Sequence, residues 1–390
     1  MIRQVTDGPH INHPTYFLQC SFFPGDGEMF FTSYRTGEAQ LFEISLASGA
    51  TRQLTRGAAI HPYSAALHPD GATLVVTRGG ELWAIGRASL QERRIFAFPG
   101  AQLGECSISP DGEWLTAAFA APSNRGLVVS RFDGTASTII PFPRTVIHPQ
   151  FHPLEPEWIE FSGDPAPRMH RVRCDGSGLE CLYLHGNDEF IVHETFLGST
   201  GDLVFTVWPR ALRVMDWTTR AIRTIVNYNA WHIAPDRAGR RILCDTNHPD
   251  EGLQVIDVAT GARRQLCLSE SSNQGSQWRK SSYALAGDFA RARHNLSWME
   301  NAVDTVYGPQ HTHPHPSWSR DESLVAFASD RTGVTQVYVG QASWPVQTGR
   351  EACPSQAKPP APPKACIGGA CFSLPGERSS PRPTSSPPGV

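Results

Sequence analysis

One sequence pattern recurs along most of this chain at intervals of about 40 residues. Each copy joins a short apolar segment, a turn of the Pro-Asp-Gly kind, a second apolar segment, a basic or glycine-containing turn and a third segment. The first turns begin at seven positions, successively 45, 41, 43, 45, 37 and 85 residues apart: Pro24, Pro69, Pro110, Pro153, Gly198, Pro235 and Arg320. A four-stranded unit of about 40 to 45 residues is the repeat of a β-propeller. We therefore predict an all-β chain folded as a seven-bladed β-propeller.

The two ends of this array predict how the ring closes. Residues 51–55, Thr-Arg-Gln-Leu-Thr, form the outer strand of the first repeat and resemble residues 2–6, Ile-Arg-Gln-Val-Thr. The last repeat shows only three strands before Val339. We predict that residues 2–6 supply its fourth strand and cover an open edge. Residues 1–342 would then form one propeller domain.

Two stretches do not fit the repeat. Residues 269–307 are an insertion before the last repeat, and their aromatic and basic side chains favour a lid over a bare linker. From residue 343 to residue 390 the composition shifts to Pro, Ser and Ala. Such a segment buries too little apolar surface to fold, so we predict a disordered tail.

Charge and cysteine usage narrow the functional class. The chain has 34 basic and 37 acidic residues, which argues against a nucleic-acid binder or a protein of membrane surfaces. No apolar run approaches the roughly 18 residues of a spanning helix, and the first residues read as folded protein rather than a leader. The nine cysteines are scattered, without zinc-ribbon spacing, and fit free thiols in a reducing compartment. We expect a cytoplasmic protein, and the sequence leaves its oligomeric state open.

The chain's densest group of potential metal ligands comes directly before the last repeat. Gln310, His311, His313 and His315 lie within six residues. On an extended segment, side chains two residues apart point the same way, so His313 and His315 would face one side together. Imidazole is the commonest protein ligand for borderline metals, and an amide oxygen can join it. Taken alone, the motif also fits a loop with surface histidines.

Histidines precede the first turn in three further repeats. The distances to the turn are all odd: five residues for His148, His193 and His315, three for His232 and seven for His313. On extended strands these side chains share one face, and the innermost strands of a propeller line its channel. We expect imidazoles from four consecutive blades around one mouth of that channel. The alternative is a histidine in a hydrogen-bond network within each blade.

Two more residues are candidates for the same region. Arg168 precedes a strand of the fourth repeat, and its guanidinium suits a carboxylate; a local pair with Asp164 is the alternative. His248 lies past the second strand of its repeat, which favours a supporting or surface position.

Together these motifs resemble the oligogalacturonate lyases, polysaccharide lyase family 22, over roughly residues 1 to 340. The matching segments are His193-Glu194-Thr195-Phe196-Leu197, Trp231-His232-Ile233-Ala234-Pro235, Gln310 with His313 and His315, and Ser329-Asp330-Arg331-Thr332-Gly333. The resemblance implies a seven-bladed propeller that binds a divalent metal, usually Mn²⁺, and cleaves short oligogalacturonates in the cytoplasm by β-elimination. It implies that the metal ligands are His232, Gln310, His313 and His315. It also implies that His193 is the Brønsted base and that Arg168 is the arginine beside it.

Some features depart from that family, and other functions stay open. The Pro-rich end is foreign to it, the insertion at 269–307 would reshape or cap the channel, and His248 competes with His232 as the third imidazole ligand. A non-enzymatic propeller scaffold of the TolB type has similar Asp-Arg-Thr-Gly blades but needs no Gln-x-x-His-x-His cluster. A metal-dependent hydrolase or epimerase would use the same channel, and an epimerase would remove the same C5 proton.

Overall fold

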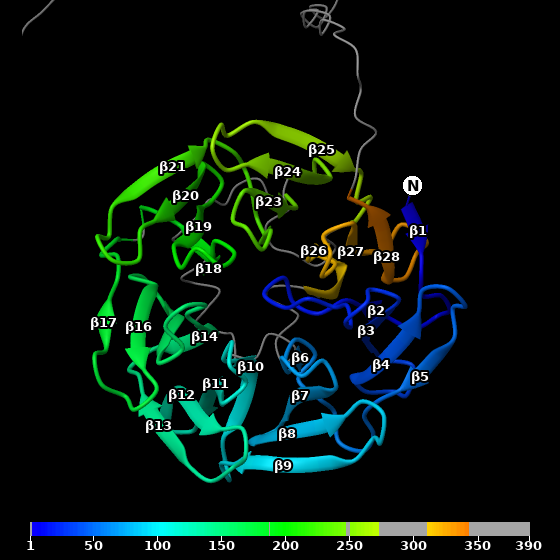
Figure 1. The fold of residues 1–390 in the computed structure, drawn as a ribbon, viewed down its shortest axis with the longest axis horizontal. Helices are drawn as coiled ribbons and strands as arrows, with labels where there is room; N and C mark the ends of the chain where they lie inside the picture. The colour runs from blue at the N-terminus through cyan, green and yellow to red at the C-terminus, as the bar shows by residue number, and fades with distance from the viewer. Residues whose placement is uncertain (1, 187, 247–249, 273–309, 343–390) are drawn as a thin grey trace, which may run out of the picture. The chain divides into compact units, whose positions relative to one another are not determined.

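The chain forms seven four-stranded antiparallel sheets around one axis, as the sequence repeat predicts (Figure 1). This computed structural model describes residues 2–186, 188–246, 250–272 and 310–342. From the inner to the outer strand, blades 1 to 4 are β2 (Asn12–His13), β3 (Glu28–Ser33), β4 (Gln40–Ser45), β5 (Thr51–Gln53); β6 (Ala66–Leu67), β7 (Thr73–Arg78), β8 (Glu81–Gly86), β9 (Glu92–Ala97); β10 (Gln102–Ile108), β11 (Trp114–Ala121), β12 (Asn124–Arg131), β13 (Ser137–Pro141); and β14 (Thr145–Phe151), β15 (Trp158–Asp164), β16 (Met169–Arg173), β17 (Glu180–Cys181). Blades 5 to 7 are β18 (Ile191–Phe196), β19 (Leu203–Val207), β20 (Ala211–Met215), β21 (Ile222–Val226); β22 (Ile233–Pro235), β23 (Arg241–Cys244), β24 (Leu253–Asp257), β25 (Arg263–Cys267); and β26 (Ser317–Trp318), β27 (Leu324–Ser329), β28 (Gln336–Gln341) with β1 (Ile2–Gln4).

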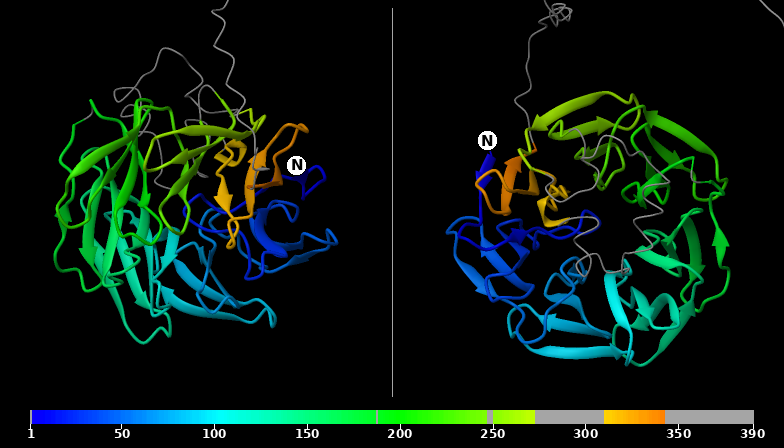
Figure 2. Two further views of the ribbon diagram at one scale, coloured as in Figure 1. Left: turned by 45° about the horizontal axis from the view of Figure 1, so that its top comes forward. Right: turned by 180° about the vertical axis from the view of Figure 1, so that it is seen from behind.

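The ring is closed by the N-terminal strand, which confirms the prediction from residues 2–6. β1 pairs antiparallel with β28, and the views in Figure 2 place the N-terminus beside that strand. The buried amide of Gln336 accepts hydrogen bonds from Thr6 Oγ1 and Asn12 Nδ2, both at 2.8 Å. Blade 1 repeats this contact, since Thr55 Oγ1 donates to Gln40 Oε1 at 2.6 Å. The similarity of residues 2–6 to residues 51–55 thus reflects one local structure used twice.

Seven apolar cores lie between neighbouring blades. Each core combines the facing side chains of two adjacent sheets, for example Leu74 and Val76 of blade 2 with Phe30 and Leu41 of blade 1. Blades 7 and 1 share such a core as well, through Val337 and Phe31. Because each blade packs on two neighbours, the closing contact has the same apolar character as the others.

Replacing Gln336 by alanine should lower the free energy of unfolding by about 2–4 kcal/mol, because it leaves buried donors of Thr6 and Asn12 without their acceptor. Denaturant unfolding monitored by fluorescence measures the change. Arg52→Ala is the control, since Arg52 forms a surface pair with Glu43 and its side chain is 42% exposed, so its loss should cost below about 1 kcal/mol. Equal small losses in both variants would contradict this account of ring closure.

One loop continues from the innermost strand of blade 1 toward the ring axis. Residues 14–20, here called the inner loop, connect β2 to the chain before β3 and point toward the ring axis (Figure 1). Tyr16 and Phe17 are 3% and 4% exposed and pack in the core between blades 5 and 6. A segment from blade 1 therefore contacts the far side of the ring.

Several predicted features lie partly or wholly outside the described residues. These are most of the insertion at 269–307, His248 and the tail from residue 343; the compact propeller unit spans Met1–Trp344.

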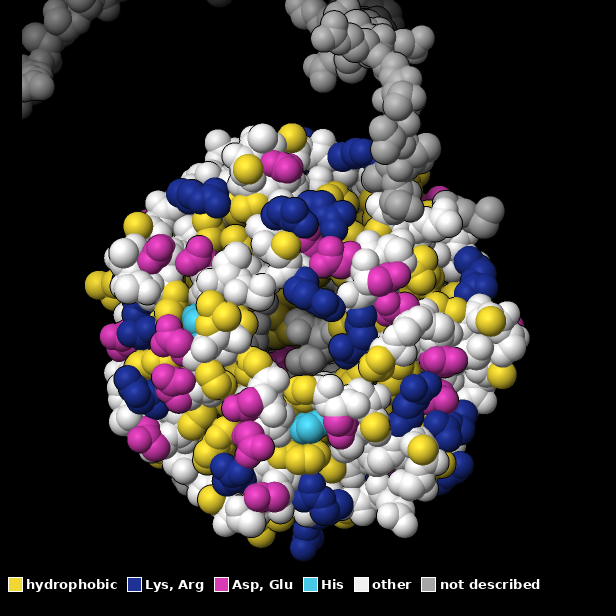
Figure 3. All heavy atoms as spheres, viewed as in Figure 1, with side chains coloured by type: hydrophobic (Ala, Val, Ile, Leu, Met, Phe, Trp, Pro, Cys, Tyr) yellow, Lys and Arg dark blue, Asp and Glu magenta, His cyan; other side chains and the backbone are white. Residues whose placement is uncertain are grey.

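Among the described residues no helix is long and apolar enough to cross a membrane, and six cysteines are free thiols. One face of the ring is hollowed at the axis, with Lys and Arg side chains around the hollow and few histidines at the surface (Figure 3).

Candidate metal centre

Imidazoles from three neighbouring blades meet at the ring axis. His193 lies in β18, His232 directly precedes β22, and His313 and His315 lie between the short 3₁₀ helix η3 (Gln310–Thr312) and β26. The ring centroid of His232 is 4.5 Å from that of His193, 5.6 Å from that of His313 and 4.0 Å from that of His315. The ring of His148, from β14, lies 5.8 Å from that of His193.

Three of these side chains have the geometry of a metal site. Nitrogen atoms of His232, His313 and His315 all lie within 4.8 Å of one another, and all three residues are buried. Within the described part of the chain, His232 Nε2 and His313 Nδ1 have no hydrogen-bond partner. Burial holds the pKa of His232 well below its ordinary value and lowers the pKa of His313 to about 4. His232 and His313 are therefore neutral, which is the form that coordinates metals, so the residues present fit a metal ion.

Asp245, which directly follows β23, orients His232. Its Oδ2 accepts from His232 Nδ1 and its Oδ1 from the backbone amide of His232, both at 2.8 Å. This bond places the ring proton on Nδ1 and leaves the Nε2 lone pair pointing into the cluster. A carboxylate behind a ligating histidine is a common support of metal sites. Burial raises the pKa of Asp245 to about 7.

The backbone at these histidines differs from the extended strands expected from the odd spacing. His148, His193 and His315 all adopt positive φ, at 56°, 54° and 43°. In blades 4 and 5 the strand register shifts at this point, between Ile147 and Gln150 and between Val192 and Thr195. An innermost strand therefore turns its histidine inward at a β-bulge rather than by simple alternation. The side chains still gather at the axis, but for a different reason from the one predicted.

His193 is a neutral imidazole beside the three-histidine group. Burial, followed by the nearby His232 and His148, holds the pKa of His193 well below its ordinary value. The edge of Trp231 packs against its ring at 4.5 Å, and His193 Nδ1 has no hydrogen-bond partner among the described residues. This arrangement suits a group that accepts a proton.

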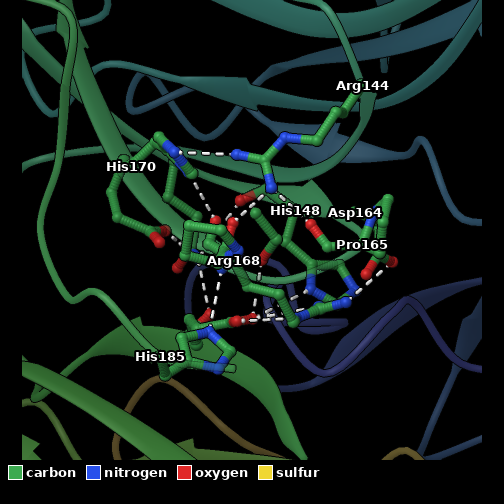
Figure 4. A network of polar contacts seen from close by, with 12 residues as sticks. Arg144, His148, Asp164, Pro165, Arg168, His170 and His185 are labelled. Carbon is green, nitrogen blue, oxygen red and sulfur yellow. Dashed lines mark hydrogen bonds and ion pairs between the residues drawn. The ribbon is translucent and has the colours of Figure 1, made fainter. Parts of the chain in front are cut away.

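Arg168 is buried in an ion-pair network (Figure 4). Its Nε contacts Glu194 Oε1 at 2.9 Å and its Nη1 contacts Asp164 Oδ2 at 2.7 Å, so the Asp164 pair considered from the sequence is present. Burial alone would raise the pKa of Glu194, but Arg168 and hydrogen bonds to the carboxylate hold it well below its ordinary value. Burial and the charge of Glu194 raise the pKa of the adjacent Glu160 well above its ordinary value.

A second layer of histidines holds the backbone around Arg168. His185 Nε2 accepts the backbone N–H of Arg168 at 2.9 Å, so its other ring nitrogen carries the proton and donates to Gly186 O. His170 Nδ1 donates to the carbonyl of Arg168 at 2.8 Å, and its Nε2 accepts from Arg144 (Figure 4). These contacts fix the position of Arg168 from both sides.

Some predicted and some unexpected residues complete the description. Gln310 begins η3, but its side chain and the whole of His248 lie outside the described residues, so their roles stay predictions. Glu194 lies in the segment singled out for His193, and Asp245 lies three residues before His248, but no pattern predicted the roles of these two carboxylates as partners. The inner loop carried no recognisable motif, because its contacts are with residues far away in the sequence.

Comparisons with known proteins support the fold and the resemblance. No family model matches the chain. It is 21% identical over 388 residues to the oligogalacturonide lyase of Pectobacterium atrosepticum and to the oligogalacturonate lyase of Dickeya dadantii, covering 87% of this chain and 92% of each relative. A solved oligogalacturonate lyase in complex with manganese superimposes with a TM-score of 0.74 at 18% identity, over 88% of this chain and 93% of that one. The resemblance indicated by the sequence motifs is thus confirmed, and the solved structure has the same fold.

Proposed function

We propose that this chain is an oligogalacturonate lyase that cleaves oligogalacturonate or a similar short uronide by β-elimination and uses a divalent metal, with Mn²⁺ the first choice. Two curated relatives are named for this activity, and the similarity covers 92% of the length of each. The observation that carries the proposal is the convergence of three buried imidazoles beside a fourth that is placed to act as a base.

His232, His313 and His315 would hold the metal, together with Gln310 as the resemblance implies. A bound divalent cation stabilises negative charge that develops on the uronate carboxylate when the neighbouring C5 proton is removed. Protons compete little with the metal for these nitrogen atoms, because burial disfavours the imidazolium form of His232 and His313.

His193 would remove the C5 proton. The residue is neutral and lies directly beside His232, so a uronate bound at the three-histidine group brings C5 close to its ring. A neutral imidazole can take a proton from a carbon acid whose conjugate base is stabilised nearby. Elimination then breaks the bond from C4 to its oxygen and leaves a 4,5-unsaturated uronide.

Arg168 would act through Glu194 rather than on the substrate carboxylate. Arg168 is 3% exposed, and its guanidinium is paired with Glu194 and Asp164. Two buried acidic side chains would otherwise lack a counter-charge. The arginine therefore maintains an ionised Glu194 next to His193 in the chain and His148 in space.

The first test is the ultraviolet absorbance of the conjugated double bond formed by elimination. Purified protein is incubated with digalacturonate or trigalacturonate, either with added Mn²⁺ or after treatment with a chelator. A metal-dependent rise supports the lyase. A protein that binds metal but produces no chromophore points to another uronide or to an epimerase, which NMR of the recovered sugar distinguishes. A protein with neither metal nor activity supports the scaffold.

Asp245→Asn should weaken Mn²⁺ binding by about 10- to 100-fold, because an amide holds the His232 ring in the required tautomer less well. Isothermal titration with Mn²⁺ measures this change. Asp250→Asn is the control, since Asp250 contacts Ser269 rather than one of the three histidines. Unchanged affinity in Asp245→Asn would mean that His232 is not a ligand.

A further inference from the structure

The inner loop brings a tyrosine to the histidine cluster. Tyr16 OH is hydrogen-bonded to His148 Nε2 at 3.0 Å, and both residues are 3% exposed. The ring of Tyr16 lies 5.0 Å from that of His315 and 6.0 Å from that of His232. The phenol ring therefore packs against the proposed metal ligands, although it comes from blade 1, and its hydroxyl is bonded to a histidine whose ring lies 5.8 Å from that of the proposed base.

His148 joins this hydroxyl to a carboxylate. Its other ring nitrogen, Nδ1, faces Glu194 Oε2 at 3.7 Å, and Glu194 is held by Arg168 and by Ser162. The backbone amide of His148 donates to Glu105 Oε2 at 3.1 Å, which stabilises its positive φ. Tyr16, His148 and Glu194 therefore form a row of hydroxyl, imidazole and carboxylate from three blades. A hydrogen bond joins the first two, and an ion-pair contact longer than a hydrogen bond joins the last two.

The reaction proposed above requires two proton transfers. In a galacturonate ring the C5 hydrogen and the C4 oxygen lie on opposite faces, so the imidazole that removes the proton cannot protonate the departing oxygen. We propose that Tyr16 is the general acid of this reaction and that His148, held by Glu194, returns the proton to Tyr16. This assignment rests on the proposed lyase function.

The proton and electron balance is complete without any further reactant. His193 takes the C5 proton, the electrons of the C5–H bond form the C4–C5 double bond, and the C4–O4 bond breaks. Tyr16 gives its phenolic proton to O4 and takes one back from Nε2 of His148, whose Nδ1 faces the Glu194 carboxylate. His193, whose ring lies 5.8 Å from that of His148, then passes its proton back to His148 through water.

Tyr16→Phe tests the assignment against a matched control, Tyr63→Phe. Tyr63 packs 5.2 Å from Tyr16 and 5.4 Å from His315, in the same cluster, but has no place in the proton path. On trigalacturonate, Tyr16→Phe should lower kcat by about 10²- to 10³-fold and Tyr63→Phe should leave it unchanged. On 4-deoxy-4-fluorogalacturonate, whose fluoride leaves without a proton, Tyr16→Phe should eliminate as fast as the unaltered protein.

The outcomes separate three explanations. An equal loss of rate on both substrates means that Tyr16 only shapes the site, and a full rate on trigalacturonate means that it does not donate the proton; either result overturns the assignment. His148→Asn should show the same dependence on the leaving group, which provides a second test if Tyr16→Phe folds poorly. Titration with Mn²⁺ verifies that each variant keeps its metal site. If the unaltered protein eliminates neither substrate, the proposed lyase function itself fails.

Discussion

Replacing His193 by alanine is expected to lower kcat for elimination by about 10²- to 10⁴-fold, the usual contribution of a positioned base. The ring of His193 lies beside the three-histidine group but is not part of it, so Mn²⁺ should bind as before. The variant separates the proton transfer from metal binding, because the two functions belong to neighbouring residues.

The measurement is the rate of chromophore formation from trigalacturonate at saturating Mn²⁺. Added imidazole should restore part of the activity of His193→Ala, since it can enter the space left by the side chain and accept the C5 proton. His68→Ala is a control, because His68 contacts a turn of blade 3 away from the axis. Full activity in His193→Ala would assign the base elsewhere, and His148 would then be the first residue to examine.

The architecture was predictable because each blade is largely determined by local sequence. The Pro-Asp-Gly turns place Gly71 and Gly112 at positive φ, which glycine adopts without strain, and the apolar segments on either side pair as antiparallel strands. Ring closure was predictable as well, because Thr6 and Thr55 make the same contact with equivalent glutamines of blades 7 and 1.

The arrangement of the site was less predictable, because it depends on contacts between distant segments. The positive φ at His193 arises from a bulge that pairing with the next strand produces, and no spacing rule contains that information. Tyr16 reaches His148 across 132 residues of sequence. Likewise, Arg168 could be assigned either to a substrate or to Asp164 until the burial of its side chain was known.

His313→Ala should abolish both Mn²⁺ binding and elimination. His313 is 1% exposed and offers its ring nitrogen to the group formed with His232 and His315, so its loss leaves two imidazoles of the three. The affinity should fall by more than the roughly 10- to 100-fold that follows from losing a residue behind a ligand. Because the cation is needed to stabilise the charge at the uronate carboxylate, activity should fall with it.

The neighbouring His311 supplies the matched control for this substitution. It lies two residues away in the same motif, and it is outside the group of three whose nitrogen atoms converge. His311→Ala should therefore retain Mn²⁺ and activity, whereas His313→Ala should lose both. Metal content after dialysis and the rate on trigalacturonate are measured for both variants. Equal retention of metal would place the ion elsewhere, and equal loss would mean that the segment as a whole, rather than the His313 ring, maintains the site.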